Sequence, residues 1–246
     1  MRQLLPTPID DIDPDDAYAS DSRPAPPGRP WVMTNMVATV DGAASIDGVS
    51  GGIGGPADRA VFGALRAMPD VILVGAGTVR AEAYGPPSTT PERQRRRVAR
   101  GQQPYPRLAV VTGRLELDLT SRLFTDSPNR PIVITSNQSS PERRDEVAQV
   151  ADVVVAGSDR VDLTEALAAL AASGVEVVLC EGGPTLDGQL VVAGLLDEVC
   201  VTVAPLLAAG VASRIMHGPT PDHPEPLRLD RVLEQDGTLL LRYVRL

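Results

Sequence analysis

The chain has 246 residues, and its content of 43% hydrophobic and 22% charged residues is ordinary for a soluble globular protein. No apolar run approaches the roughly 18 residues that a membrane span needs, and the acidic N-terminus lacks the pattern of a secretory signal, so we expect a cytoplasmic protein. The net charge of −9 has the wrong sign for binding nucleic acid or an anionic membrane, and two cysteines with two histidines cannot easily build a zinc site, so no metal is expected.

The first 30 residues differ in composition from the rest of the chain, because they carry seven prolines and a cluster of aspartates. This composition predicts a mostly irregular N-terminal arm over residues 1–30. Residues 31–246 alternate apolar runs with helical patterns, which predicts a single α/β domain.

Short apolar runs rich in β-branched residues are typical of strands that are buried on both faces, as in a parallel sheet. They predict strands at residues 31–40, 70–74, 108–112, 132–135, 153–156, 175–180 and 199–203. Helices are expected between them, at residues 56–68, 141–150 and 163–172. The arginine-rich segment 84–107 is expected to be a solvated loop or short helix, and we assign it no function. At the C-terminal end, Asp236-Gly237 separates two strand patterns, which predicts an antiparallel hairpin over residues 227–244. The fold class is therefore α/β, with a mostly parallel central sheet, flanking helices and this hairpin.

Small or hydroxylated residues follow five of the predicted strands. In an open parallel sheet, ligands bind outside the carboxyl ends of the strands, so these residues predict a ligand-binding edge. The segments concerned are Gly75–Thr78, Thr112–Arg114, Thr135–Asn137, Ala156–Ser158 and Glu181–Thr185. Two of them, Gly75–Thr78 and Glu181–Thr185, open helices, where unpaired N–H groups suit a pyrophosphate. Arg80 stands where a Rossmann fingerprint needs glycine, which disfavours a standard Rossmann site.

Taken together, several motifs resemble the reductase domain of bifunctional riboflavin-biosynthesis proteins, which has a dihydrofolate-reductase-like fold. The motifs are Ala38-Thr-Val-Asp-Gly42, Leu65-Arg66-Ala67, Asp70-Val-Ile-Leu-Val-Gly-Ala-Gly-Thr78, Glu181-Gly-Gly-Pro-Thr-Leu186, Ala193-Gly-Leu-Leu-Asp-Glu198 and Ala204-Pro205. The deaminase domain that accompanies this reductase in the bifunctional proteins is missing, so a stand-alone reductase is expected.

The resemblance implies that NADPH binds along the strand edge. The residues it implies as cofactor contacts are Ala38, Gly75, Thr78, Glu82, Thr112, Ser136, Gly182, Gly183, Pro184, Thr185 and Leu186. Ser136 is implied near the 2′-phosphate. The sequence agrees with NADPH rather than NADH, because Ser136-Asn137 offers polar groups and no carboxylate to repel that phosphate.

For the substrate, the resemblance implies that Arg66 contacts a ribose phosphate and that Ser50 is a second contact of the substrate. A guanidinium suits a phosphate dianion, although an arginine can also simply end a helix favourably. Glu181 is implied between substrate and cofactor. Asp41 is either a carboxylate near the substrate or part of an Asp-Gly turn. The resemblance also implies a homodimer.

The chain departs from the family pattern around the phosphate. Family members usually carry a second phosphate-binding arginine after the Thr78 helix, and Glu82–Pro87 contains none. Ala43 replaces a basic residue, and Gly52 replaces an aromatic one. The expected function is NADPH-dependent reduction of 5-amino-6-(5-phosphoribosylamino)uracil or a related pyrimidine. A dihydrofolate or pterin reductase and a non-catalytic NADP-binding protein remain open alternatives.

Overall fold

The computed structural model describes residues 1–46 and 48–246. These residues divide into two compact units, each assembled from separate stretches of the chain. Unit 1 contains Met1–Arg23, Val32–Met68 and Cys180–Leu246, and unit 2 contains Pro24–Trp31 and Pro69–Leu179. The single domain expected over residues 31–246 stays a prediction.

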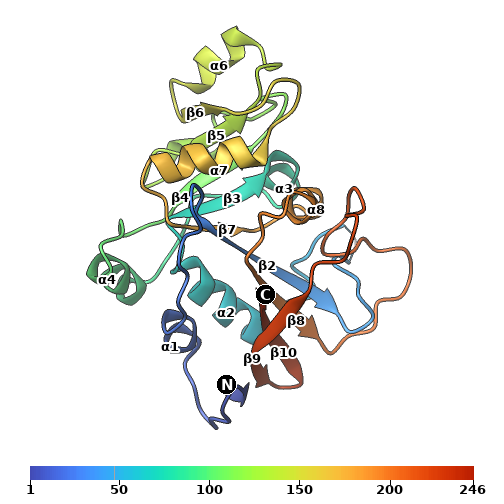
Figure 1. The fold of residues 1–246 in the computed structure, drawn as a ribbon. Coiled ribbons are helices and arrows are strands. Elements are labelled where there is room, and N and C mark those ends of the chain that lie inside the picture. The colour runs from blue at the N-terminus through green and yellow to red at the C-terminus, as the bar shows by residue number, and fades with distance from the viewer. Residues whose placement is uncertain (47) are drawn as a thin grey trace. The chain divides into compact units, whose positions relative to one another are not determined.

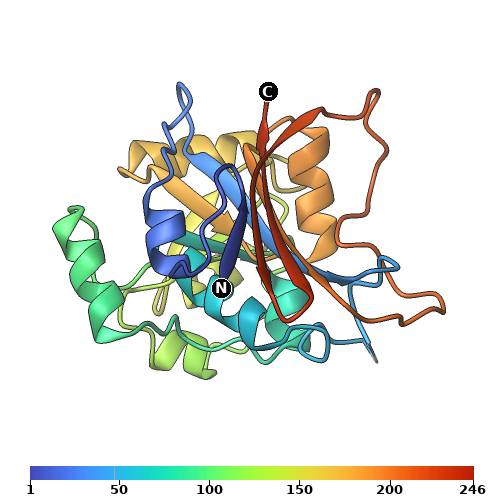
Figure 2. The same ribbon diagram turned by 90° about the horizontal axis from the view of Figure 1, so that it is seen from below.

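Unit 1 is built on strands that are hydrogen-bonded in the order β1-β9-β10-β8-β2 (Figures 1 and 2). Their bounds are β1 (Arg2–Leu5), β2 (Trp31–Thr39), β8 (Glu198–Ala204), β9 (Leu227–Gln235) and β10 (Thr238–Arg245). β2 and β8 are parallel, whereas β8, β10, β9 and β1 are joined by antiparallel pairs. The helices of this unit are α1 (Pro14–Ala19), α2 (Pro56–Arg66) and α8 (Pro184–Val192).

The predicted C-terminal hairpin is confirmed. Asp236 (φ 52°) and Gly237 (φ 80°) connect β9 to β10 with two positive φ angles, as a two-residue turn that fits the strand twist requires. Figure 2 shows β1 lying beside this hairpin, so β9 has neighbours on both sides over residues 232–234.

Unit 2 contains strands in the order β7-β3-β4-β5-β6. Their bounds are β3 (Val71–Gly75), β4 (Arg107–Val111), β5 (Ile132–Thr135), β6 (Asp152–Val155) and β7 (Val177–Cys180). β3, β4, β5 and β6 pair in parallel, which confirms the mostly parallel sheet. The core is aliphatic, with Ile72, Leu108, Val110 and Val133 almost fully buried.

The helices of unit 2 are α3 (Ala76–Ala81), α4 (Pro91–Ala99), α5 (Arg122–Thr125), α6 (Pro141–Val147) and α7 (Leu163–Ala172). α7 lies across the strands of this sheet (Figure 1) and ends before Gly174, whose φ of 86° is the left-handed geometry of a helix end. No helix in the described ranges has both the length and the apolar character to cross a membrane.

Residues 1–30, expected to be a mostly irregular arm, contain the strand β1 and the helix α1. Pro14 occupies the first turn of α1, and the Asp13 side chain accepts a hydrogen bond from the Asp15 N–H at 2.7 Å. The aspartates and prolines that suggested an irregular arm therefore begin a helix, since both residue types are favourable at that end. Tyr18 of α1 is buried.

The arginine-rich segment 84–107 forms the short helix α4, but one of its arginines is not solvated. Arg97 is buried and donates hydrogen bonds to the carbonyl oxygens of Pro69 (2.6 Å) and Gln103 (2.9 Å). The long apolar stem of arginine allows this burial when carbonyls receive the guanidinium. Arg97 is therefore a packing residue of unit 2.

Candidate active site

In unit 2, the carboxyl ends of four parallel strands lie at one edge of the sheet, as predicted. Gly75, Thr112, Ser136 and Ala156 stand at or directly after these ends. The hydroxyl oxygen of Ser136 is buried and has no hydrogen-bond partner in the part of the chain that the structure describes, and the same is true of Thr135. A buried polar atom without a partner costs free energy, so this edge is prepared to accept one.

The other predicted cofactor contacts of unit 2 are not buried polar atoms without a partner. Thr112 accepts a hydrogen bond from the Leu115 N–H at 3.1 Å, which closes a local turn. Thr78 is half-buried within α3, and Glu82 is exposed at its C-terminal end. The edge therefore combines Thr112, which serves the local fold, with the Ser136 hydroxyl, which has no partner within the described residues.

In unit 1, α8 begins at the Gly182-Gly183 turn. Gly182 has a φ of 89°, which glycine adopts without strain, and Gly183 is an N-cap without a side-chain hydrogen bond. Pro184 follows in the first turn, where its missing N–H costs nothing. The N–H groups of Leu186 and Asp187 donate to the Gly183 carbonyl, so Thr185 carries the N–H of this first turn that no side-chain cap satisfies within the described residues.

A buried acid lies directly under this turn. Asp187 Oδ1 accepts a hydrogen bond from the Thr34 hydroxyl at 2.9 Å, and the same hydroxyl lies 3.0 Å from the Cys180 carbonyl oxygen. One hydroxyl hydrogen cannot serve both acceptors, but a protonated Asp187 can donate to Thr34, which then donates to Cys180. Burial raises the pKa of Asp187 to about 7, against the opposing hydrogen bonds of Cys180 and Thr34. Sequence reasoning missed Asp187, although an acid inside the apolar pattern of α8 was a signal.

Two predicted site residues, Arg66 and Glu181, are brought together. Arg66 Nε and Nη2 donate to Glu181 Oε1 and Oε2, each at 2.7 Å, in a bidentate ion pair. Arg66 also stacks on Phe62, with its guanidinium carbon 4.2 Å from the ring centroid. The pair holds the Arg66 side chain, at the C-terminal end of α2, against Glu181. Glu181 immediately precedes the Gly182-Gly183 turn.

Asp41 is held within a turn after β2. Its carboxylate accepts hydrogen bonds from the Thr39 hydroxyl (2.5 Å) and from the N–H groups of Ala208 (3.2 Å) and Ala209 (2.7 Å). These hydrogen bonds, that of Thr39 foremost, lower the pKa of Asp41 to about 2. Asp41 is thus ionised at neutral pH and connects the turn after β2 with the loop that contains Ala208 and Ala209.

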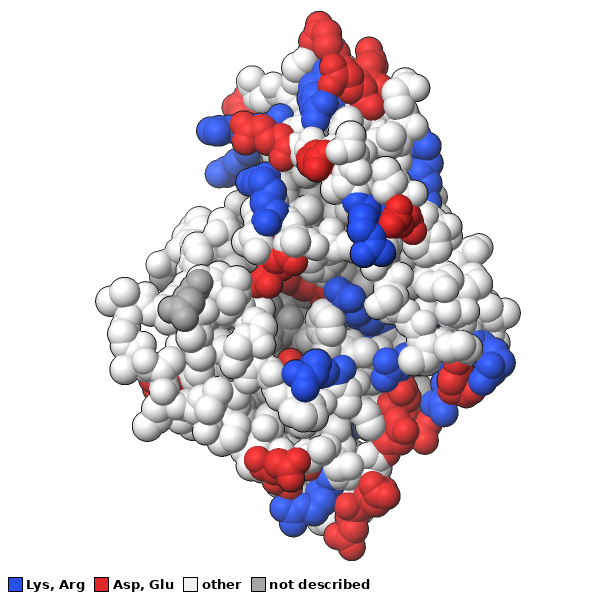
Figure 3. Space-filling model, turned by 180° about the vertical axis from the view of Figure 1, so that it is seen from behind, with Lys and Arg blue, Asp and Glu red and all other residues white. Residues whose placement is uncertain are grey.

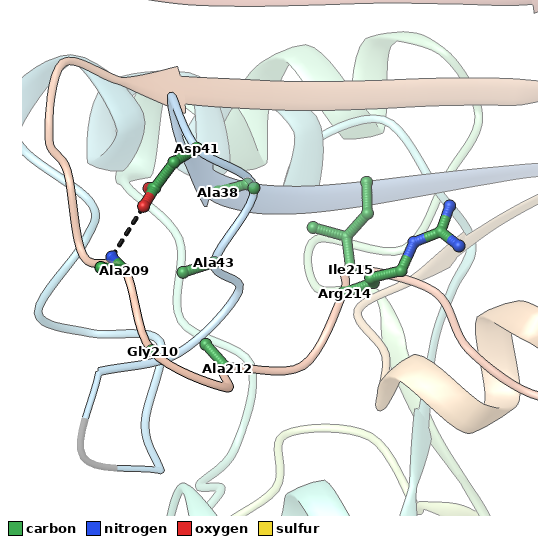
Figure 4. Close-up of a pocket in the computed structure, with 9 residues that line it drawn as sticks. Ala38, Asp41, Ala43, Ala209, Gly210, Ala212, Arg214 and Ile215 are labelled. Atoms are coloured by element: carbon green, nitrogen blue, oxygen red, sulfur yellow. Dashed lines mark hydrogen bonds between the residues drawn. The ribbon is translucent and has the colours of Figure 1, made fainter.

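A pocket of about 540 Å³ opens between the end of β2 and the loop that joins β8 to β9. Its lining is mostly alanine and glycine, with two charged side chains, Asp41 and Arg214. Figure 4 shows Asp41 turned toward Ala209 and the Arg214 guanidinium at the other end of the pocket, turned away from Asp41. Ala38, a predicted cofactor contact, also lines it.

The contribution of residues 205–215 was not predicted, because this loop of mostly small and apolar residues has no periodic signal. Ser50, a predicted substrate contact, is half-buried, and its carbonyl accepts a hydrogen bond from the Ile53 N–H at 3.0 Å. Ser50 is not among the residues that line this pocket.

Comparisons with known proteins identify the family to which the chain belongs. Residues 30–238 match the RibD C-terminal domain. The chain is 34% identical over 183 residues to 2,5-diamino-6-ribosylamino-4(3H)-pyrimidinone 5′-phosphate reductase of Archaeoglobus fulgidus, covering 74% of this chain and 83% of that protein. It is also 31% identical over 190 residues to the riboflavin biosynthesis protein RibD of Mycobacterium tuberculosis, covering 76% of this chain and 46% of that protein.

Solved structures support the fold class. A pyrimidine reductase-like protein from Corynebacterium diphtheriae superposes with a TM-score of 0.79 at 28% identity, covering 88% of this chain and 92% of that one. The Saccharomyces cerevisiae riboflavin biosynthesis reductase Rib7 superposes with a TM-score of 0.69 at 16% identity, covering 93% of this chain and 95% of that one. The predicted dihydrofolate-reductase-like fold is therefore confirmed.

Proposed function

We propose that this chain, which belongs to the RibD C-terminal domain family, reduces a phosphorylated ribosylaminopyrimidine with NADPH. Membership makes it an oxidoreductase of the pyrimidine reductase kind and implies a reduced nicotinamide cofactor. The observation that carries the proposal is the Glu181-Gly182-Gly183 segment, where a carboxylate held by Arg66 directly precedes an uncapped helix start. A helix start suits the pyrophosphate of a nicotinamide cofactor. A polar pair that is held in place suits the orientation of a substrate for hydride transfer.

Each unit, taken by itself, offers groups that suit a phosphate group of NADPH. In unit 2, the unpartnered Ser136 hydroxyl and the exposed Asn137 would accept the 2′-phosphate, with Thr78 and Thr112 nearby on the same strand edge. In unit 1, residues Gly182–Leu186 would receive the pyrophosphate at the positive end of α8.

The bound nicotinamide supplies the hydride, so the protein contributes mainly orientation. Arg66 and Glu181 form one rigid polar unit that would align the substrate, and we assign Ser50 to the same substrate. Asp41 is ionised, and its oxygens accept hydrogen bonds from Thr39 and Ala209. These contacts support a role in positioning the loop that joins β8 to β9 rather than in donating a proton.

The test is a substrate panel followed by loss of NADPH absorbance. We expect turnover of 2,5-diamino-6-ribosylamino-4(3H)-pyrimidinone 5′-phosphate or of 5-amino-6-(5-phosphoribosylamino)uracil. Turnover of dihydrofolate or dihydropterins alone would replace this function with pterin reduction. NADPH binding without turnover of any of these compounds would favour a non-catalytic nucleotide-binding protein.

The homodimer that the resemblance implies stays part of the proposal, but residues 199–203 have no free strand edge to offer a partner. Residues 199–203 belong to β8, which lies between β10 and β2. β9 is covered by β1 only over residues 232–234, so residues 227–230 keep an edge beyond that pairing. A dimer would use this edge or another surface. Light scattering at micromolar concentration tests it, and a monomer mass would exclude it.

A further inference from the structure

Arg214 differs from every other arginine of unit 1. The sequence has no lysine, and nine of its 23 arginines belong to this unit. Eight of the nine donate a hydrogen bond to a carboxylate or a carbonyl of the same unit. Over residues 1–46 and 48–246, no hydrogen bond or ion pair of Arg214 is present. Its positive charge is therefore available to a ligand.

The backbone around Arg214 is nevertheless fixed. The carbonyl of the preceding residue, Ser213, accepts a hydrogen bond from the Ala44 N–H at 3.0 Å. Three residues later, the His217 N–H donates to the Pro184 carbonyl at 3.1 Å. Figure 2 shows this loop running beside the loop that follows β2. Arg214 thus stands between two anchors, one at the end of β2 and one at the start of α8.

One face of β2 connects the pocket with the Gly182-Gly183 turn. Side chains two residues apart point to the same face of a strand and are separated by roughly 7 Å. Ala38 lines the pocket, and Met36 Sδ lies 3.8 Å from the point where a Cβ of residue 182 would stand. The pocket therefore adjoins the segment to which the proposed function assigns cofactor binding.

The charges and size of the pocket indicate the class of ligand. Asp41, the other charged residue of the lining, already receives three donors, whereas the remaining lining residues, apart from Ile215, are alanines and glycines. In Figure 3, the visible face of this loop and of the loop after β2 shows few charged side chains. An isolated guanidinium at a pocket of about 540 Å³ suits a single anionic group such as a phosphate monoester.

We propose that Arg214 binds the phosphate of the substrate in this pocket and so supplies the arginine that is missing from Glu82–Pro87. The Arg66 guanidinium donates two hydrogen bonds to the Glu181 carboxylate, so its charge is already compensated within the protein. The phosphate carries a charge of about −2, and Arg214 provides the uncompensated positive charge that it requires. This inference rests on the proposed function, because it names a contact of the same substrate.

The test compares phosphorylated and dephosphorylated forms of the ribosylaminopyrimidine in the wild type and in Arg214→Ala. We expect Arg214→Ala to lower kcat/KM for the phosphorylated form by about 10- to 100-fold and to leave the dephosphorylated form within about threefold. The kcat/KM of Arg214→Lys for the phosphorylated form should lie between those of the wild type and Arg214→Ala. Arg228→Ala is the matched control, since it also removes one exposed arginine of unit 1, and it should keep the preference for the phosphorylated form. Arg214→Ala with an unchanged preference would overturn the proposal.

A binding measurement separates this inference from the proposed function. Ribose 5-phosphate is titrated calorimetrically into the wild type and Arg214→Ala, without NADPH. Binding that weakens at least tenfold in Arg214→Ala supports the site even if no pyrimidine is reduced. Equal binding by both proteins, or no binding by the wild type, overturns it.

Discussion

Arg66 and Glu181, 115 residues apart in the sequence, form a bidentate ion pair in which the Glu181 side chain is 3% exposed. Removing one partner of such a pair leaves a buried charge without compensation. Arg66→Ala should therefore destabilise the protein by on the order of 3 kcal/mol, measured as the free energy of unfolding in urea. Because Arg66 also contacts the substrate in the proposed function, kcat/KM for the phosphorylated pyrimidine should fall by about 10- to 100-fold.

A double-mutant cycle separates the two effects of Arg66. Replacing both residues, as Arg66→Met with Glu181→Leu, removes the uncompensated charge, so the loss of stability should be smaller than the sum of the single losses. Additive losses would show that the pair is not coupled. Wild-type kcat/KM in Arg66→Ala would withdraw Arg66 from the substrate site.

The cofactor preference is the second prediction. The unpartnered Ser136 hydroxyl and the absence of a carboxylate at that strand end should make NADPH bind more tightly than NADH. Ser136→Asp should reverse or abolish the difference by repelling the 2′-phosphate, while Ser127→Asp, on a loop of the same unit, serves as the control. Calorimetric titration with both cofactors measures this, and equal affinities in the wild type would contradict it.

Asp187 gives a pH-dependent prediction. Burial raises its pKa from 3.8 to about 7 in the folded protein, so the folded state keeps a proton that the unfolded chain loses above about pH 4. Stability contributed by this proton is complete below pH 4, falls as the pH rises toward 7, and is lost above it. The whole change amounts to on the order of 4 kcal/mol at ~1.4 kcal/mol per pKa unit.

Asp187→Asn removes this titration while keeping the shape of the side chain. The stability of Asp187→Asn relative to wild type should therefore rise between pH 5 and pH 8, measured by urea unfolding at both values. A difference that does not change with pH would show that Asp187 is ionised in the folded protein throughout.

Gly188 allows the loop that contains His217 to pack closely against α8. A Cβ at this position would stand 2.2 Å from the His217 carbonyl oxygen, which is far inside contact distance. Alanine usually stabilises a helix interior by about 1 kcal/mol over glycine, but here the overlap with backbone should dominate and cost about 1–3 kcal/mol. Gly51→Ala, which meets nothing within 4 Å, is the control. Unchanged stability of Gly188→Ala would mean that the loop moves freely from α8.

Much of the fold could be predicted because its signals are local. The Asp236-Gly237 turn, the C-terminal glycine of α7 and the prolines that begin α2 and α8 all act within a few residues. The parallel strands of unit 2 were equally visible, since a strand buried on both faces is apolar throughout.

The site was predictable only where the family motifs reach. The partners of Arg66 and Asp187 lie 115 and 153 residues away, and no spacing rule connects positions so far apart. Arg214 was missed for a different reason, because an arginine in a small-residue loop resembles a solvated charge until its neighbours are known. The ion pairs of the N-terminal arm were missed for the same reason, since Asp21 and Arg23 pair with Arg231 and Glu198, which lie far along the chain.

Those residues give the last prediction. Arg23 donates to both carboxylate oxygens of Glu198, at 2.9 and 3.0 Å, and Arg242 donates to the same two oxygens at 2.9 and 3.1 Å. Burial alone would raise the pKa of Glu198, but the two arginines outweigh it and lower the pKa from 4.5 to about 2. The stability that Glu198 contributes is therefore present above pH 4.5 and is lost as the pH falls toward 2.

Arg23→Gln should cost on the order of 3 kcal/mol at pH 7 and raise the midpoint of acid unfolding, followed by far-UV circular dichroism. Arg2→Gln, which breaks the exposed pair with Glu234, should cost less than about 1 kcal/mol. Equal losses in the two variants would show that the N-terminal arm does not hold the buried charge of β8.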